Sequence, residues 1–417
     1  MGVQNKTAID KIVVCPDKFK GGPDSLSVSC AIKRGIEGYL SQRCGISSVF
    51  SEAPTIRCIE MADGGDGSAR LFGKLCNARE VFLRACGPLG EEVETSYMLC
   101  DGPSPISPHP SAFIECARIC GLAMVEEGLR NPLKTTTFGL GQLVLDAIGK
   151  GAETICVGLG GSATNDLGTG MLQALGFEMG LGSSVKATGG TLGSIKAIGE
   201  IGDKELKKKL ASVKFLIIND VDNPLLGPRG ATYVYSAQKG ADEKSMARME
   251  KDADSLLDRI SLVSASGKTA RQTSLQEGAG AAGGLGFAFM HFLGAGSESG
   301  FSFFGNRLQG LTSLIEEADL LISGEGSVDS QSLMGKVVGG VCRVIKLSLR
   351  KKEKSLMLFC GESRLGIEEL ARASGCKRVA IQKLSDIEPD IRNRIGREIP
   401  LLEKEAFLSA KELDTTL

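Results

Sequence analysis

Short apolar runs that end in polar, glycine-containing segments recur along the chain. The first run, Ile12 to Cys15, is followed by a loop and by Asp24, a candidate N-cap. Behind it, Val28, Ile32 and Ile36 have the spacing of one helix face. Similar apolar runs predict further strands at Ile56 to Met61, Thr154 to Val157, Phe215 to Ile218, Leu320 to Ile322, Leu356 to Cys360 and Arg378 to Ile381. Strands that alternate with helices indicate an α/β protein with a largely parallel sheet covered on both faces.

The middle of the chain has a different pattern. The runs Glu80 to Ala85, Glu94 to Cys100 and Phe113 to Cys116, with Gly87-Pro88-Leu89-Gly90 between the first two, predict antiparallel hairpins. We therefore expect the two chain ends, 1–79 and 286–417, to form one doubly wound domain. Residues 80–285 would be inserted into it as a second, mixed-sheet α/β domain.

Composition excludes several classes of protein. The chain has 417 residues, 42% of them hydrophobic, a formal net charge of −1, 2 His, 13 Cys and no Trp. Near-neutral charge argues against capture of nucleic acid or of an anionic membrane as the main activity. Two histidines cannot build a His-based metal cage. The cysteines form no C-x-x-C pair and are expected to be buried thiols in a reducing compartment. No targeting signal is evident, so a cytoplasmic protein acting on small molecules is expected.

Glycine is in excess, with 55 residues against an average usage of about 7%. Much of the excess lies where strands end, beside Asp, Asn and Lys. Bare backbone N–H groups can approach phosphate, carboxylates can hold Mg²⁺ or take a proton, and lysines neutralise phosphate oxygens. One such loop would be ordinary turn chemistry, but five indicate phosphoryl transfer. The loops are Asp17 to Gly22, Asp63 to Gly67, Gly160 to Asp166, Asn219 to Pro224 and Gly324 to Asp329.

One alternative is an NAD(P)-dependent oxidoreductase. Gly158 to Ala163 follows a predicted strand and fits G-x-G-x-x-A, with Glu178 about twenty residues further on. Against it, this strand lies far inside the chain. Thr164-Asn165-Asp166 would also place polar groups where the helix of such a motif packs on the sheet.

The residues also carry a resemblance to a known family. The chain resembles the type I glycerate kinases in motifs that follow in family order from residue 12 to about 340. The main ones are Pro16-Asp17-x-Phe19-Lys20-Gly21, Ala62 to Gly67, Gly87 to Gly90, Arg130 to Thr137, Gly160 to Asp166, Asp220 to Pro228, Gln238-Lys239-Gly240, Gly278 to Gly286 and Gly324-Glu325-Gly326. The resemblance implies ATP- and Mg²⁺-dependent phosphorylation of D-glycerate, with 2-phosphoglycerate favoured over 3-phosphoglycerate. It also implies two α/β domains, one flavodoxin-like, with the active site in the cleft between them. The first loop departs from the family, because Lys18 and Gly22 replace two serines.

Candidate roles follow as hypotheses. Asp166 or Asp220 would accept the proton of the glycerate hydroxyl, and Lys20 is the third catalytic candidate. Asp63, Asp66 and Asp329 are candidates for Mg²⁺. Lys20, Lys134 and Lys239 would face the substrate carboxylate or the polyphosphate. Arg130 would be a bidentate carboxylate clamp or a tie between the domains. The backbone of Gly160, Gly161 and Ser162 would receive phosphate at a helix N-terminus. The other expected ligand-binding residues are Asp17, Lys18, Gly64, Gly65, Asn131, Thr164, Asn165, Asp222, Asn223, Gly283, Gly284, Gly324, Glu325 and Lys336.

Overall fold

The computed structural model describes residues 8–19, 22–43, 49–182, 184–333, 336–349 and 353–416. The chain folds into two compact units, Met1–Asp63 with Gly300–Leu417 and Gly64–Ser299. The unit limits lie at other residues than the predicted domain limits of 79/80 and 285/286. The reason is that helix α2 (Ser68–Cys76) contacts strands β4 and β5, and strand β8 pairs with β7, all of which belong to the second unit.

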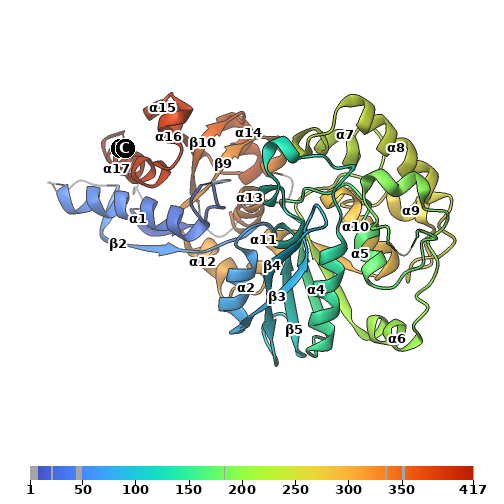
Figure 1. The fold of residues 1–417 in the computed structure, drawn as a ribbon. Coiled ribbons are helices and arrows are strands. Elements are labelled where there is room, and N and C mark those ends of the chain that lie inside the picture. Colours follow the sequence, from blue (N-terminus) through green and yellow to red (C-terminus); the bar gives the residue numbers. More distant parts are fainter. Residues whose placement is uncertain are drawn as a thin grey trace. The chain divides into compact units, whose positions relative to one another are not determined.

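The first unit contains one parallel sheet (Figure 1). Its strands are β1 (Ile9–Val14), β2 (Phe50–Cys58), β9 (Leu320–Val328), β10 (Ser355–Ser363) and β11 (Arg378–Lys383). They lie in the order β11-β10-β9-β1-β2, and every neighbouring pair is parallel. Numbered along this unit, the order is 2-1-3-4-5, which is that of flavodoxin. The doubly wound, flavodoxin-like sheet expected from the sequence is confirmed.

Helices cover this sheet because successive strand residues are buried on opposite faces. Ile12 and Val14 pack in one core with helix α1 (Ser25–Gln42) and helix α17 (Glu398–Thr416), which lie side by side (Figure 1). The Asp24 side chain accepts from Ser27 N at 2.8 Å and caps α1, as predicted. The remaining helical segments of the unit are α11 (Gly300–Gly305), α12 (Leu311–Glu317), η5 (Ser330–Leu333), α13 (Val337–Ser348), α14 (Ile367–Ser374), α15 (Leu384–Ile387) and α16 (Ile391–Arg394).

The second unit contains a mixed sheet. Its strands are β3 (Arg79–Cys86), β4 (Glu92–Cys100), β5 (Ser111–Glu115), β6 (Thr154–Gly158), β7 (Lys214–Ile218) and β8 (Gly296–Glu298). They lie in the order of the chain, antiparallel from β3 to β5 and parallel from β5 to β8. The predicted hairpin and the predicted mixed sheet are both confirmed.

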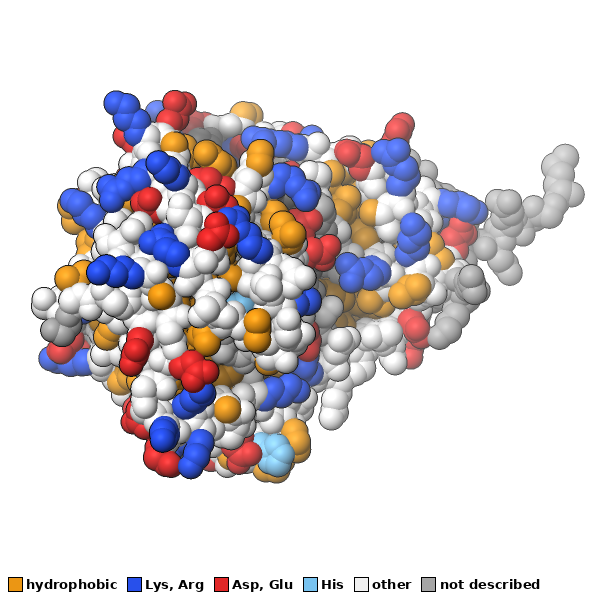
Figure 2. Space-filling model, turned by 90° about the vertical axis from the view of Figure 1, so that its right-hand side faces the viewer, with side chains coloured by type: hydrophobic (Ala, Val, Ile, Leu, Met, Phe, Trp, Pro, Cys, Tyr) orange, Lys and Arg blue, Asp and Glu red, His pale blue; other side chains and the backbone are white. Residues whose placement is uncertain are grey.

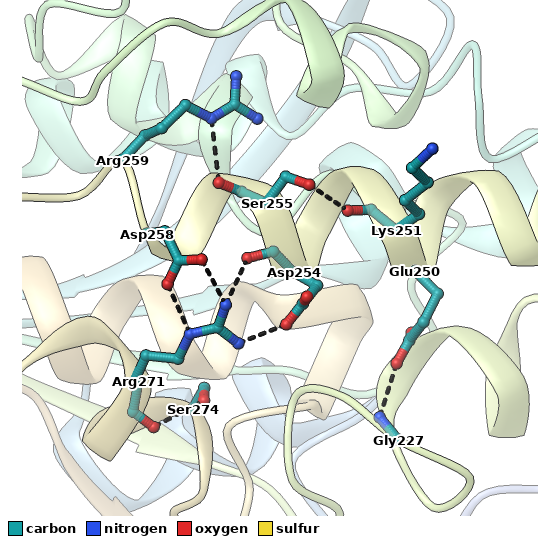
Figure 3. Close-up of polar contacts among 9 residues, drawn as sticks. All are labelled: Gly227, Glu250, Lys251, Asp254, Ser255, Asp258, Arg259, Arg271 and Ser274. Carbon is teal, nitrogen blue, oxygen red and sulfur yellow. Dashed lines mark hydrogen bonds and ion pairs between the residues drawn. The ribbon is translucent and has the colours of Figure 1, made fainter.

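Most helical segments of the second unit are short. They are α2, α3 (Ala117–Cys120), η1 (Leu122–Met124), η2 (Glu127–Leu129), α4 (Phe138–Gly149), α5 (Thr169–Ala174), η3 (Gly189–Ser194), α6 (Lys204–Ser212), α7 (Ala231–Tyr235), η4 (Ala237–Lys239), α8 (Glu243–Leu257), α9 (Ala270–Ser274) and α10 (Ala281–Phe292). Arg271 of α9 donates to both carboxylate oxygens of Asp258 at 2.8 Å and also pairs with Asp254 (Figure 3). These ion pairs are exposed, so they orient α9 against α8 more than they stabilise the fold.

The surface and the thiols agree with the composition. Lys and Arg are interspersed with Asp and Glu over the face drawn in Figure 2. Ten of the twelve cysteines that the structure describes are buried, and all twelve are free thiols. No helix among the described residues has the length and apolar character that a membrane crossing needs.

Candidate functional site

In the first unit, charged side chains gather where strands β1 and β9 lie next to each other. Connections leave these two strands in opposite directions, and the crevice outside such strand ends is where α/β sheets bind ligands. Asp17 follows β1 and is held there by a hydrogen bond from its N–H to Gly324 O at 2.7 Å. Gly324 and Glu325 lie within β9, which continues to Val328, so the loop predicted to begin at Gly324 is wrong. A Cβ at Gly324 would lie 2.0 Å from Phe359 O, so close strand packing requires this glycine.

Three carboxylates and two ammonium groups share this strand end. Lys18 Nζ lies 3.2 Å from Asp63 Oδ1, and Lys336 Nζ lies 3.2 Å from Glu325 Oε2. Asp17 and Glu325 are 3% and 6% exposed. Burial, and then the nearby Asp63 charge, raises the pKa of Asp17 well above its usual value. Burial likewise raises the pKa of Glu325, against the opposing effect of Lys336. The structure therefore brings together five residues that the sequence predicted as ligands.

The three predicted Mg²⁺ ligands do not form one cluster. Asp329 acts electrostatically on Glu325 and Lys336 in the first unit. Asp66 is exposed in the second unit, and its Oδ1 would lie 4.0 Å from a Cβ at Gly161. Among the described residues, no group of three or more His, Cys, Asp or Glu side chains could hold a metal ion. Lys20, the third catalytic candidate, lies outside the described residues.

In the second unit, the loop Gly158–Gly168 follows strand β6 and is packed tightly against the chain around it. A Cβ at Gly158 would lie 2.2 Å from Gly64 O, and a Cβ at Gly160 would lie 2.7 Å from Gly65 Cα. These distances are far below normal contact. Gly158 and Gly160 are thus glycines because the backbone of Gly64 and Gly65 packs directly on them, and Gly64 itself has φ of +86° with its Cβ position 2.7 Å from Ile218 Cγ2. Gly64, Gly65 and Gly160, which the sequence suggested as ligand-binding, all lie in this packed contact.

The glycines of α10 have the same function on another side of this loop. Gly283 and Gly284 have φ of +68° and +91°, a left-handed conformation that interrupts the helix. A Cβ at Gly283 would lie 2.1 Å from Thr164 O, and Gly283 O accepts a hydrogen bond from Leu167 N at 3.0 Å. Here too, close packing accounts for glycines that the sequence suggested as a nucleotide cradle.

This packing leads to a first prediction. We expect Gly160→Ala to reduce the free energy of unfolding by about 1–3 kcal/mol, because the added methyl group overpacks the contact with Gly65. Chemical denaturation measures it, with Gly149→Ala as the control because a Cβ there meets nothing within 4 Å. Wild-type stability combined with weakened ATP binding would instead show that the Gly160 backbone faces the nucleotide.

Asp166 is buried at the far end of the loop, and both of its carboxylate oxygens accept hydrogen bonds. Its carboxylate accepts hydrogen bonds from Thr137 N (2.9 Å), Thr137 Oγ1 (2.8 Å), Gly168 N (3.0 Å) and Gly170 N (3.2 Å). It is 0% exposed. Burial raises its pKa, and the bonds from Thr137 and the two glycines oppose this shift. The carboxylate therefore joins the first turns of α4 and α5. This function differs from that of the general base, which the sequence predicted for Asp166. Thr137 was missed as its partner, although the run Thr135-Thr136-Thr137 is prominent in the sequence.

Lys239 lies in η4 and is also buried, with 3% exposure. Its Nζ donates to Thr164 O at 2.6 Å and to Ser162 Oγ at 3.2 Å. Burial lowers the pKa of Lys239 to about 8. Gly240 is left-handed and packs on the Arg130 backbone, where a Cβ would lie 2.0 Å from Arg130 O. The predicted substrate-facing lysine is therefore directed at the loop itself.

The N–H groups of the loop differ in their partners. Gly160 N donates to Gly64 O at 3.4 Å, whereas the N–H groups of Gly161 and Ser162 donate to no acceptor among the described residues. Helix α5 begins only at Thr169, so the helix N-terminus expected directly behind Ser162 is wrong. The same distance argues against the dinucleotide fingerprint, in which the third glycine position opens a helix.

The loop after strand β7 carries the other base candidate. Asn219 donates from Nδ2 to Ser297 Oγ at 3.0 Å and accepts from Val221 N at 3.0 Å. Asn223 Oδ1 accepts from Tyr235 Oη and its Nδ2 donates to Arg229 O at 2.7 Å. These bonds fix both ends of the loop. Asp220 is half-buried and Asp222 is exposed between them.

The segment that begins at Arg130 gives little sign of a carboxylate clamp. Arg130 Nε donates to Val125 O at 3.3 Å. Asn131 Oδ1 accepts from Leu133 N at 3.0 Å, and Asn131 O accepts from Lys134 N at 2.9 Å, which makes a turn. Lys134 is exposed on this turn. Arg130 is half-buried, and Lys134 is the more exposed of the two cationic residues.

Comparison with known proteins gives one consistent result. The model of the glycerate kinase family matches residues 12–404. A glycerate kinase of Bacillus subtilis is 38% identical over 339 residues, covering 81% of this chain and 82% of that protein. A glycerate 2-kinase of Escherichia coli is 36% identical over 341 residues, with the same coverage. The crystal structure of a protein described as a glycerate kinase 2, from Salmonella typhimurium LT2, has a TM-score of 0.69 and 31% identity, covering 97% of this chain and 98% of that chain.

These relatives are phosphotransferases by name, and none of them supports the oxidoreductase alternative built on Gly158 to Ala163. The family model also spans both compact units, so the match does not depend on one motif or on one sheet. The chain belongs to the glycerate kinase family.

Proposed function

We propose that this protein transfers a phosphoryl group from ATP to a hydroxyl of D-glycerate. The observation that carries the proposal is the loop Gly158–Gly168, on which four family segments converge. Gly64–Gly65, Thr135–Thr137, Lys239 and Gly283–Gly284 all bond to it or pack on it. Such a loop is preorganised, and phosphoryl transfer depends mainly on positioning and on stabilisation of charge.

The two groups of polar residues suit different tasks. In the second unit, the loop offers the N–H groups of Gly161 and Ser162 to an anionic oxygen, and Asp220 is the better candidate for the general base. In the first unit, the lysines Lys18 and Lys336 would bind anionic groups of the substrates. Each assignment is a proposal. Substituting the residues of one unit tests its assignment separately from that of the other unit.

The carboxylates of the first unit fit Mg²⁺ that arrives with the nucleotide. Mg²⁺ is usually held by one or two carboxylates together with substrate phosphates, rather than by a cage of protein ligands. Asp17 and Asp63 are close enough that the Asp63 charge raises the pKa of Asp17. We propose that Asp63 would hold the ion, with Asp17 beside it. When bound, the ion would neutralise charge on the phosphate oxygens.

We further propose 2-phosphoglycerate as the product. The Escherichia coli relative is named a glycerate 2-kinase, which supports the 2-position. The test is incubation of the protein with MgATP and D-glycerate, followed by chromatographic separation of the two phosphoglycerates. Either ligand at 100 times its Kd should also stabilise the fold by about 2.7 kcal/mol. If neither phosphoglycerate forms, the proposed activity is excluded, and 3-phosphoglycerate alone would exclude the positional assignment.

A further inference from the structure

Lys239 has an unusual environment for a buried ammonium group. Its two hydrogen-bond acceptors, Ser162 Oγ and Thr164 O, are both uncharged. Among the described residues no carboxylate lies within ion-pair distance of Lys239. The titratable groups that act on it are Cys116, Cys120 and Asp166, and the Asp166 carboxylate is already bound by four other donors. A buried charge without a partner is costly, so an anion is expected to compensate it.

Ser162 links this ammonium group to the exposed part of the loop. Its hydroxyl accepts from Lys239, so its own proton must be donated elsewhere. The N–H of Ser162 and the N–H of Gly161 also donate to no acceptor in the described part of the chain, and Gly161 is exposed. The three donors therefore come from two consecutive residues, of which Gly161 is exposed and Ser162 is 7% exposed.

A second observation also points to a ligand. Thr164 Oγ1 and Asn165 Oδ1 have no hydrogen-bond partner in the structure as described, and both residues are 0% exposed. Buried polar atoms are nearly always satisfied in folded proteins, so such a pair beside Lys239 calls for an explanation. Both atoms lie in the segment that follows Ser162, so a further partner is expected at this part of the loop.

We propose that the N–H groups of Gly161 and Ser162, together with the Ser162 hydroxyl, bind an anionic oxygen of a substrate. Lys239 is a positioning residue, which holds the hydroxyl as a donor toward the ligand and supplies positive charge from behind it. The proposal rests on the proposed function, since the anion is either the phosphate of ATP or the carboxylate of glycerate. Both are bound by the same set of donors.

The binding test needs no turnover. Thermal unfolding is followed with inorganic phosphate and, separately, with D-glycerate, for the wild type and for Ser162→Ala. The wild type should be stabilised by one of the two, which identifies the source of the anion, and Ser162→Ala should lose that stabilisation. If neither anion stabilises the wild type, or if Ser162→Ala responds equally, the anion site does not exist. A protein that binds the anion but has no kinase activity would still give this binding result. The proposed anion site and the proposed kinase activity can therefore fail separately.

The kinetic test asks whether Lys239 acts through Ser162. Ser162→Ala and Lys239→Met should each raise the KM of the same substrate by about 10- to 100-fold, the range for hydrogen bonds to charged groups. The double variant should be no worse than the poorer single variant, and Lys239→Arg should restore part of the loss. Lys207→Met is the matched control, because Lys207 is an exposed lysine on α6. Multiplicative losses in the double variant would overturn the positioning role.

The pH profile separates positioning from simple structural support. Because the pKa of Lys239 is about 8, kcat/KM for that substrate should fall as the pH rises through this range and the ammonium group loses its charge. The alkaline fall should disappear in Lys239→Met and shrink in Ser162→Ala. A fall of equal size in all three proteins would show that another group is responsible.

Discussion

Asp220→Asn is expected to lower kcat at least about 100-fold at saturating MgATP and D-glycerate, the cost of losing a general base. Asp220 is the second residue after β7 and lies in a loop whose two ends are fixed by Asn219 and Asn223. Asp220 is half-buried as a residue, and its Oδ2 is a buried atom. An amide has nearly the same shape but cannot take the proton, so the KM values should change much less than kcat.

The measurement is a steady-state assay at several concentrations of both substrates. Asp254→Asn is a matched control, because Asp254 is an exposed aspartate on α8 that pairs with Arg271 (Figure 3). It should leave kcat within about twofold of the wild type. A kcat near the wild-type value for Asp220→Asn would remove Asp220 as the base. A rise in both KM values at unchanged kcat would instead make it a binding residue.

The sequence predicted the buried strands and two of the edge strands, β3 and β11, but it misplaced the edge strand β2 and missed the edge strand β8. Thr154–Gly158 and Lys214–Ile218 lie in the middle of their sheet and consist mostly of apolar residues, so a short apolar run revealed them. Strand β2 is at an edge and begins at Phe50 rather than at the predicted Ile56. Its solvent-facing positions include Glu52 and Arg57, and polar residues on an exposed face remove the apolar signal.

The sequence indicated which residues lie together in the first unit, but it did not indicate the function of each residue. Asp17, Lys18, Asp63, Glu325 and Lys336 were named from the ends of different strands, and the structure brings them together at β1 and β9. A parallel sheet collects its strand ends on one edge, so this clustering could be foreseen.

The functions of the glycines and of the buried polar residues could not be foreseen in the same way. Gly160 and Gly283 are glycines because another backbone passes within 3 Å of the position of a Cβ. Lys239 and Asp166 are directed into the protein, where their partners come from loops distant in sequence. The residue type is the same in a ligand site and in such a packing site. Only tertiary contacts distinguish the two.

Asp166→Ala is expected to reduce the free energy of unfolding of the second unit by about 3 kcal/mol or more. The substitution leaves the N–H groups of Thr137, Gly168 and Gly170 buried without their acceptor. Each unsatisfied buried donor costs about 1–3 kcal/mol, and the site is too enclosed for solvent to replace the carboxylate fully. Asp166→Asn should cost less than Asp166→Ala, because the amide keeps one acceptor oxygen. It should still reduce stability, because its NH₂ group would face these N–H donors.

Urea unfolding followed by circular dichroism measures the loss, with ΔG read from each transition observed, because a chain of two compact units need not unfold in one step. Thr137→Val is the informative companion, because the Thr137 hydroxyl donates to Asp166 and accepts from Met171 N. It should cost about 1–2 kcal/mol, and it should cost less in the Asp166→Ala background, since the two changes remove one shared bond. If Asp166→Asn unfolds like the wild type but loses at least about 100-fold in kcat, the carboxylate is catalytic after all. The hydrogen bonds to Asp166 would then serve to tune a base, and Asp220 would be left as a substrate ligand.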